Sequence, residues 1–196
     1  MLKKLLRSSR VVPDAAPAPA PGSRIYAIGD IHGCRAELDR LLALIDADDA
    51  ARGPAETTLI FLGDLVDRGP DSAGVIARLM RLAQDRPRVR FLKGNHEELF
   101  LHALSGAKDA LRMFCRVGGK ETVLSYGIGR AEYDSLDYAE LAARMEALIP
   151  AEHRAFLDGF EDLIVSGDYA FVHAGVRPDV PLDEQKPSDL RWIRDS

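Results

Sequence analysis

Short apolar runs alternate with longer stretches in which apolar residues recur at helical spacing. Strands are predicted at residues 25–28, 58–62 and 89–92, which are short and mostly apolar. A helical stretch follows each of these runs. Strands that alternate with helices are typical of βα units, so the pattern predicts an α/β fold with a parallel sheet.

Three helices with one apolar side are predicted between and after these strands. The first covers about 35–46, the second begins near Ser72 as its N-cap and ends near Gln84, and the third covers about 97–104. The residues expected to face the core from the first two helices are Leu38, Leu41, Leu42 and Ile45, and Val75, Ile76, Leu79 and Leu82.

The rest of the chain has a different pattern of apolar and polar residues. Residues 105–162 contain mostly helical periodicity and are predicted to form a helical insertion over the sheet, whereas 163–165 and 169–172 are predicted to pair as a hairpin. Residues 1–24 are rich in Pro and Ala and have no period, which predicts a disordered tail. The expected organisation is thus a tail followed by one domain over 25–196.

Composition narrows the classes of function. Apolar residues make up 46% and charged residues 29%, as in ordinary globular proteins, and the net charge of -5 argues against a broad groove for nucleic-acid polymers. The negative net charge does not exclude a small phosphorylated ligand. Two cysteines, Cys34 and Cys115, predict no disulfide framework and favour a reducing cytoplasm. The apolar runs are shorter than the roughly 18 residues that a membrane-spanning helix needs, so no membrane-spanning helix is expected.

Four predicted strands end directly in side chains that bind metals or transfer protons. In chain order these are Asp30 and His32, then Asp64, Asp67 and Arg68, then Asn95 and His96, and finally His173. Ligands of open α/β sheets bind outside the carboxyl ends of the strands, so these side chains are expected to meet in one pocket.

The donor types in this pocket predict a metal site that acts on phosphate. Asp, His and Asn suit manganese, iron or zinc, and no thiolate is among them. Asp64 is well placed to bridge two cations, which at about 3.5–4 Å apart would clamp a phosphate and deprotonate a water for in-line attack. The guanidinium of Arg68 can hold phosphate oxygens by its fork.

Four sequence strings carry a family resemblance. They are Gly-Asp-Ile-His-Gly at 29–33, Gly-Asp-Leu-Val-Asp-Arg-Gly at 63–69, Gly-Asn-His-Glu at 94–97 and His-Ala-Gly at 173–175. Over about residues 25–196 the chain resembles the calcineurin-like metallophosphoesterases, in the phosphoprotein phosphatase branch. The resemblance implies a β-sandwich flanked by helices in αββα layers.

The resemblance also implies roles for individual residues. Asp30 and His32 would ligate a first metal, Asp64 would bridge, and Asn95 with His173 would ligate a second, with manganese as the expected ion in vitro. His96 would be the general acid, oriented by Asp67. Arg68 and Arg194 would bind phosphate, with Arg177 as the alternative to Arg194.

One departure from the family pattern concerns the end of the chain. Members of the family continue into a Gly-His motif that completes the second metal site, and into closing strands, whereas this sequence stops at Ser196. We therefore expect a domain that lacks its last strands and a second metal that is weakly held. Either the sequence is a fragment, or water and a partner subunit complete the site.

The implied function is hydrolysis of phosphate monoesters by a metal-activated hydroxide. The string Val66-Asp-Arg-Gly69 and Glu97 favour a serine/threonine protein phosphatase, whose partner would be a phosphorylated protein. Two alternatives stay open. One is a hydrolase of dinucleoside polyphosphates such as diadenosine tetraphosphate, a small phosphoester, and the other is a non-catalytic phosphate-binding module.

Overall fold

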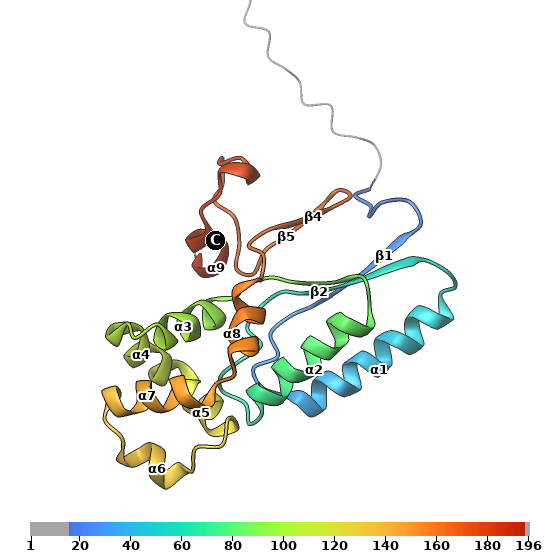
Figure 1. Cartoon of the computed structure of the whole chain (residues 1–196). Helices are drawn as coiled ribbons and strands as arrows, with labels where there is room; N and C mark the ends of the chain where they lie inside the picture. Colours follow the sequence, from blue (N-terminus) through green and yellow to red (C-terminus); the bar gives the residue numbers. More distant parts are fainter. Residues whose placement is uncertain (1–15, 195–196) are drawn as a thin grey trace, which may run out of the picture.

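A parallel three-stranded sheet forms the centre of the molecule (Figure 1). The structure is a computed structural model, and it describes residues 16–194, so that most of the expected tail and the last two residues lie outside the described range. The strands β1 (Ser23–Ile28), β2 (Glu56–Phe61) and β3 (Val89–Phe91) lie side by side in chain order. The predicted α/β class is confirmed.

Helices α1 (Arg35–Ala51) and α2 (Ser72–Asp85) cover one face of this sheet (Figure 1). Side chains alternate along β2, so Leu59 and Phe61 join the large core with the helices, whereas Ile60 faces the opposite side. The four apolar residues predicted to face inward from α2 are all buried. This layer accounts for most of the apolar burial that positions the strand ends.

Two details of these helices differ from the prediction. Leu41 was expected inward but is 39% exposed, because it lies beyond the stripe of Leu38, Leu42 and Ile45 and borders an open pocket beside the edge strand β1. The N-cap of α2 is Asp71, whose Oδ1 accepts from the backbone N–H of Gly74 at 2.8 Å. The helix does begin at Ser72.

A hairpin covers the other face of the sheet. Strands β4 (Ile164–Ser166) and β5 (Tyr169–Phe171) pair antiparallel, as predicted, and Ile164 packs with Ile60 and Leu92 in a small second core. The described chain thus has helices, a parallel sheet and a second, two-stranded sheet in successive layers. The parallel sheet flanked by helices is confirmed, whereas the full αββα order of layers stays a prediction.

Helices fill the segment between the central sheet and the hairpin. In chain order they are α3 (Asn95–Leu104), α4 (Lys108–Phe114), a π-helical turn (Cys115–Gly119), α5 (Lys120–Ser125), α6 (Arg130–Ser135), α7 (Tyr138–Leu148) and α8 (Ala151–Asp158). Phe100 of α3 stacks on Phe114 of α4, and both are fully buried. A 3₁₀ turn (Leu182–Glu184) and α9 (Pro187–Trp192) follow the hairpin.

The described part of the expected tail is ordered against the hairpin. The backbone N–H of Asp168 donates to the carbonyl of Ala18 at 3.0 Å, and the backbone N–H of Ala18 donates to the Asp168 carboxylate at 3.1 Å. The hydroxyl of Tyr169 donates to the carbonyl of Pro17 at 2.9 Å. Strand β1 already begins at Ser23. The first strand thus begins two residues before the predicted start of the domain at residue 25.

One buried carboxylate joins the loop after β2 to the start of α3. Glu97 is fully buried, and its Oε2 accepts from the backbone N–H groups of Asp64 at 2.8 Å and Gly94 at 2.9 Å, while its Oε1 accepts from Leu65 N–H at 2.7 Å. The two loops are so close that a Cβ on Gly94 would lie 2.5 Å from the nitrogen of Asp64. Glu97 therefore fixes two strand ends relative to each other.

Replacing Glu97 with Gln tests this role. One oxygen becomes an amide NH₂ that faces backbone donors, so at least one buried N–H loses its acceptor. We expect the free energy of unfolding to fall by about 1–3 kcal/mol, measured by urea denaturation. Glu37→Gln on the exposed face of α1 is the control and should stay within about 0.5 kcal/mol of the wild type. Equal values for the two variants would contradict the role of Glu97.

Candidate functional site

Four residues that carry side chains adopt the left-handed backbone conformation at the strand ends. The φ angles are 44° at His32, 52° at Asp64, 72° at Asp67 and 68° at Arg68. Such angles are uncommon for residues other than glycine, and they persist only where the surrounding structure holds them. All four were predicted as site residues, so the strained backbone coincides with the predicted chemistry.

Two histidines are held in the tautomer that leaves Nε2 unprotonated. His32 donates its Nδ1–H to the carbonyl of Val66 at 2.7 Å, and His173 donates its Nδ1–H to the carbonyl of Leu62 at 2.7 Å. A carbonyl can only accept, which places the proton of each neutral ring on Nδ1. Histidines that bind metals are commonly oriented in this way.

The predicted ligands converge on the buried carboxylate of Asp64. Its Oδ2 lies 3.7 Å from His32 Nε2, and its Oδ1 lies 3.4 Å from His173 Nε2. Asp30 Oδ2 lies 3.8 Å from His32 Nε2, and Asn95 Oδ1 lies 3.1 Å from His173 Nε2. The structure thus brings together all five side chains that were predicted as metal ligands.

This cluster has the character of a cation site. Near His173, the lone pair of Nε2 faces Asn95 Oδ1 and Asp64 Oδ1, and no proton of the neutral ring lies between these acceptors. Acceptors that face one another in this way are compatible when a cation lies between them. Among the described residues, two sets of donor atoms lie within 4.8 Å of one another: His32, Asp64 and His96, and Asp30, Asp64 and His173.

The grouping differs in one respect from the expected division of ligands. Asp64 belongs to both sets, as a bridging residue would, but Asp30 joins His173 rather than only His32. His96, predicted as an acid, joins the set of His32. The residues therefore fit divalent cations as a group, and the assignment of each to one ion stays a prediction.

His96 and Asp67 form a buried hydrogen-bonded pair. His96 Nδ1 lies 2.7 Å from Asp67 Oδ2, and neither side chain is more than 2% exposed. Burial alone would lower the pKa of His96, but the hydrogen bond to Asp67 and the charges of Asp64 and Asp67 outweigh burial and raise it above its ordinary value. The pair can therefore hold a proton on the imidazole.

Arg68 connects the two parts of the site. Its Nη1 donates to His32 Nε2 at 2.9 Å and its Nη2 donates to His96 Nε2 at 2.9 Å. The guanidinium therefore lies beside both the candidate ligands and the candidate acid, where its N–H groups can bind phosphate oxygens. A cation and Arg68 would compete for the lone pair of His32.

The structure distinguishes between the two arginines considered at the end of the chain. Arg194 reaches the site, because its Nη2 donates to Asn95 Oδ1 at 3.3 Å. Arg177 instead forms a two-pronged ion pair with Asp189, with N···O distances of 2.8 and 2.9 Å. This ion pair lowers the pKa of Asp189. Arg194 is thus the better candidate for a second phosphate contact.

Two residues that support the site, Glu97 and Thr122, were not predicted as site residues. Burial, with the charge of Asp64, raises the pKa of Glu97 to about 7, against the effect of its backbone hydrogen bonds. Its spacing of three residues from Gly94, at a helix start, was a usable signal. Thr122 bonds to Asp67 from α5, 55 residues along the chain, and no local pattern could have indicated that contact.

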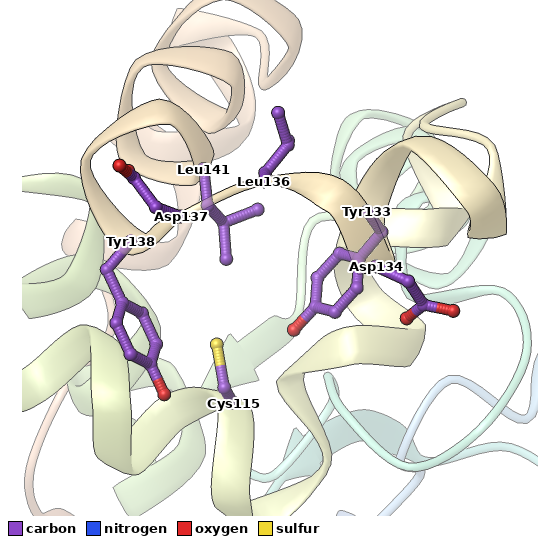
Figure 2. A pocket seen from close by; sticks show the side chains of 7 residues that line it. All are labelled: Cys115, Tyr133, Asp134, Leu136, Asp137, Tyr138 and Leu141. Atoms are coloured by element: carbon purple, nitrogen blue, oxygen red, sulfur yellow. The ribbon is translucent and has the colours of Figure 1, made fainter.

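A separate pocket in the insertion has different chemistry. Its volume is about 490 Å³, and Figure 2 shows Tyr133 and Tyr138 on either side of Cys115. None of its seven lining residues is basic, and two are aspartates, which makes the pocket unfavourable for phosphate. Burial raises the pKa of the Cys115 thiol, so this thiol is not activated. This pocket is therefore a poorer candidate for phosphate chemistry than the strand-end site.

Comparisons with known proteins identify the family of the chain. Residues 23–195 match the family Calcineurin-like phosphoesterase. A relative from Methylococcus capsulatus, named symmetrical bis(5'-nucleosyl)-tetraphosphatase, is 37% identical over 79% of this chain and 44% of its own length. A protein of the same name from Acidovorax sp. (strain JS42) is 34% identical over 82% of this chain and 47% of its own. The chain spans about half the length of these curated relatives.

A solved structure is also similar to this chain. A crystal structure named as a candidate diadenosine tetraphosphatase aligns with a TM-score of 0.60 and 25% identity, covering 90% of this chain and 61% of that one. These three proteins are named for the hydrolysis of dinucleoside tetraphosphates and not as protein phosphatases. None of the helices in residues 16–194 combines the length and apolarity that a membrane crossing requires. The chain belongs to the calcineurin-like phosphoesterase family and to its phosphoprotein phosphatase-like branch.

Proposed function

We propose that this chain hydrolyses the polyphosphate bridge of a dinucleoside polyphosphate, with divalent cations bound at the cluster around Asp64. The observation that carries the proposal is the set of facing acceptors at Asp64, His173 and Asn95, next to the guanidinium of Arg68. Cation ligands and a phosphate-binding fork side by side are what phosphoryl transfer requires. The choice of a dinucleotide is supported by the names of the relatives.

In the proposed reaction, the oxygen of a water molecule forms a bond to phosphorus. The bond from that phosphorus to the bridging oxygen breaks, the electron pair stays on the leaving oxygen, and the attacking water loses one proton to the solvent. When bound, divalent cations at this donor set supply Lewis acidity to phosphate and lower the pKa of water. Arg68, and Arg194 beside Asn95, neutralise charge on the phosphate oxygens.

His96 is the proposed source of the proton that the leaving oxygen takes up. Its Nδ1 is held by Asp67, so the proton to be delivered is on Nε2 of the imidazolium. In the structure, Nε2 accepts a hydrogen bond from Arg68 Nη2, so Nε2 can carry this proton only once the guanidinium turns to the phosphate that it is proposed to bind. The proposed acid, His96, and the proposed phosphate-binding group, Arg68, therefore face the same part of the site.

A phosphorylated protein remains the second candidate substrate. The specific observation in its favour is the string Val66-Asp-Arg-Gly69 followed by Glu97. Glu97, however, accepts backbone N–H groups in the interior and contacts no surface where a peptide would bind. We therefore place the dinucleotide first. A cytoplasmic location is part of the proposal, because Cys34 and Cys115 are both free thiols.

The test compares two substrates on the purified chain with added Mn²⁺. We expect turnover of diadenosine tetraphosphate and slower or no release of phosphate from a phosphoserine peptide. Chromatography of the products separates symmetrical cleavage, which yields two molecules of ADP, from asymmetrical cleavage, which yields ATP and AMP. His96→Asn should reduce kcat by about 10²–10⁴-fold.

Each outcome of this comparison decides between the candidates. Turnover of the peptide alone would support the protein phosphatase and overturn our choice. Binding of both compounds without turnover of either would support the non-catalytic module. An unchanged rate in His96→Asn would exclude His96 as the acid.

Metal binding gives an independent prediction. We expect calorimetric titration with Mn²⁺ to show two unequal sites, because among the described residues the donor set near His173 contains Asp30, Asp64 and Asn95, whereas the set near His32 contains Asp64 and His96. Asp64→Asn should weaken both sites by more than the roughly 10–100-fold typical of changes outside the ligand set. His173→Ala should weaken one site only.

The matched control for the metal titration is His102→Ala. His102 is an exposed histidine on α3 and belongs to neither donor set. Its replacement should leave both affinities unchanged. Loss of binding in this control, or two intact sites in Asp64→Asn, would contradict the assignment of the cluster.

A further inference from the structure

The helical insertion holds the most strained turn of the site. Asp67 and Arg68 are consecutive left-handed residues, and each donates its backbone N–H to the insertion: Asp67 to Thr122 Oγ1 at 2.8 Å and Arg68 to the carbonyl of Gly118 at 2.9 Å. The approach is close, since a Cβ on Gly118 would lie 2.7 Å from Arg68 Cγ. The conformation of this turn therefore depends on a segment about 50 residues further along the chain.

The hydroxyl of Thr122 has a defined role in this contact. It lies 2.7 Å from Asp67 Oδ1, and because a carboxylate only accepts, the hydroxyl donates there. Its lone pairs then accept from Asp67 N–H and from the hydroxyl of Ser72 at 2.9 Å. Thr122 and Ser72 are both fully buried, so no water competes for these bonds.

Thr122 thereby fixes the rotation of the Asp67 carboxylate. With Oδ1 held by Thr122, Oδ2 is the oxygen that faces His96 Nδ1 at 2.7 Å. The imidazole in turn presents Nε2 to Arg68. A chain of hydrogen bonds thus runs from α5 to the face of His96 on which the phosphate is expected.

We propose that Thr122 is a positioning residue, which acts through Asp67 to aim the proton of His96 at the leaving oxygen. The inference rests on the proposed hydrolysis of a phosphoester. Without the hydroxyl, the Asp67 carboxylate is free to turn and the imidazole loses its fixed orientation. A misaligned acid harms poor leaving groups most, because they depend most on receiving a proton.

The experiment uses two substrates that differ mainly in the leaving group. Phenyl phosphate releases a more basic oxygen than 4-nitrophenyl phosphate, and the two compounds are similar in size. In Thr122→Val we expect kcat for phenyl phosphate to fall by about 10-fold or more, and kcat for 4-nitrophenyl phosphate to fall by less than about 3-fold. KM should stay unchanged for both, and Thr122→Ser, which keeps the hydroxyl, should restore the ratio of the two rates.

Ser125→Ala is the matched control. Ser125 lies on the same helix, and its hydroxyl accepts from Ala73 N–H at 3.1 Å and donates to the carbonyl of Thr122 at 2.6 Å. It joins α5 to α2 but does not contact Asp67. Its loss should lower stability without altering the ratio of rates, which separates a packing defect from a misdirected proton.

The remaining outcomes are decisive. Equal losses on both substrates in Thr122→Val, a change in KM alone, or no rescue by Ser would overturn the positioning role while leaving the proposed function intact. If the wild type hydrolyses neither these compounds nor diadenosine tetraphosphate, the proposed function fails and the inference falls with it. If it hydrolyses diadenosine tetraphosphate alone, an unchanged kcat of Thr122→Val on that substrate would overturn the positioning role. Urea denaturation verifies that each variant is folded, and Thr122→Ala replaces Thr122→Val if the latter is unfolded.

Discussion

The geometry of the site depends on the carboxylate of Glu97. Parallel strands bring their carboxyl ends to one edge, but they leave the loops beyond that edge with unpaired N–H groups. Glu97 accepts N–H groups from the loop after β2 and from the start of α3, and so joins them without water. Asp64 and Asn95, which follow directly from these loops, are held at a fixed separation as a result.

A second constraint acts on the protons of the site. The backbone carbonyls of Val66 and Leu62, both in the segment after β2, accept the Nδ1–H groups of His32 and His173, and the same segment contains Asp64. The orientation of the two rings and the position of their protons are therefore determined by the main chain rather than by mobile side chains. This agrees with the general finding that supporting hydrogen bonds matter nearly as much as the ligands themselves.

Much of this arrangement could be predicted from local pattern, and the exceptions have physical reasons. Strand ends are recognisable because an apolar run stops at a polar residue, so Asp30, Asp64 and His173 could be found from the sequence. Leu41 could not be placed, since helical spacing does not indicate that β1 is an edge strand. Thr122 could not be found either, because a buried hydroxyl in a short helix resembles any other until its distant partner is known.

The close contact between Gly94 and Asp64 has a consequence for how such proteins diversify. Any side chain at position 94 would separate the two loops, so substitutions there are incompatible with the arrangement of the candidate ligands. The covering helices, by contrast, form hydrogen bonds to the turn of Asp67 and Arg68 through Thr122 and Gly118, and we expect evolutionary change to fall on these helices more than on the strand ends. New substrate preferences can then arise by remodelling this cover, while the underlying reaction centre is inherited unaltered.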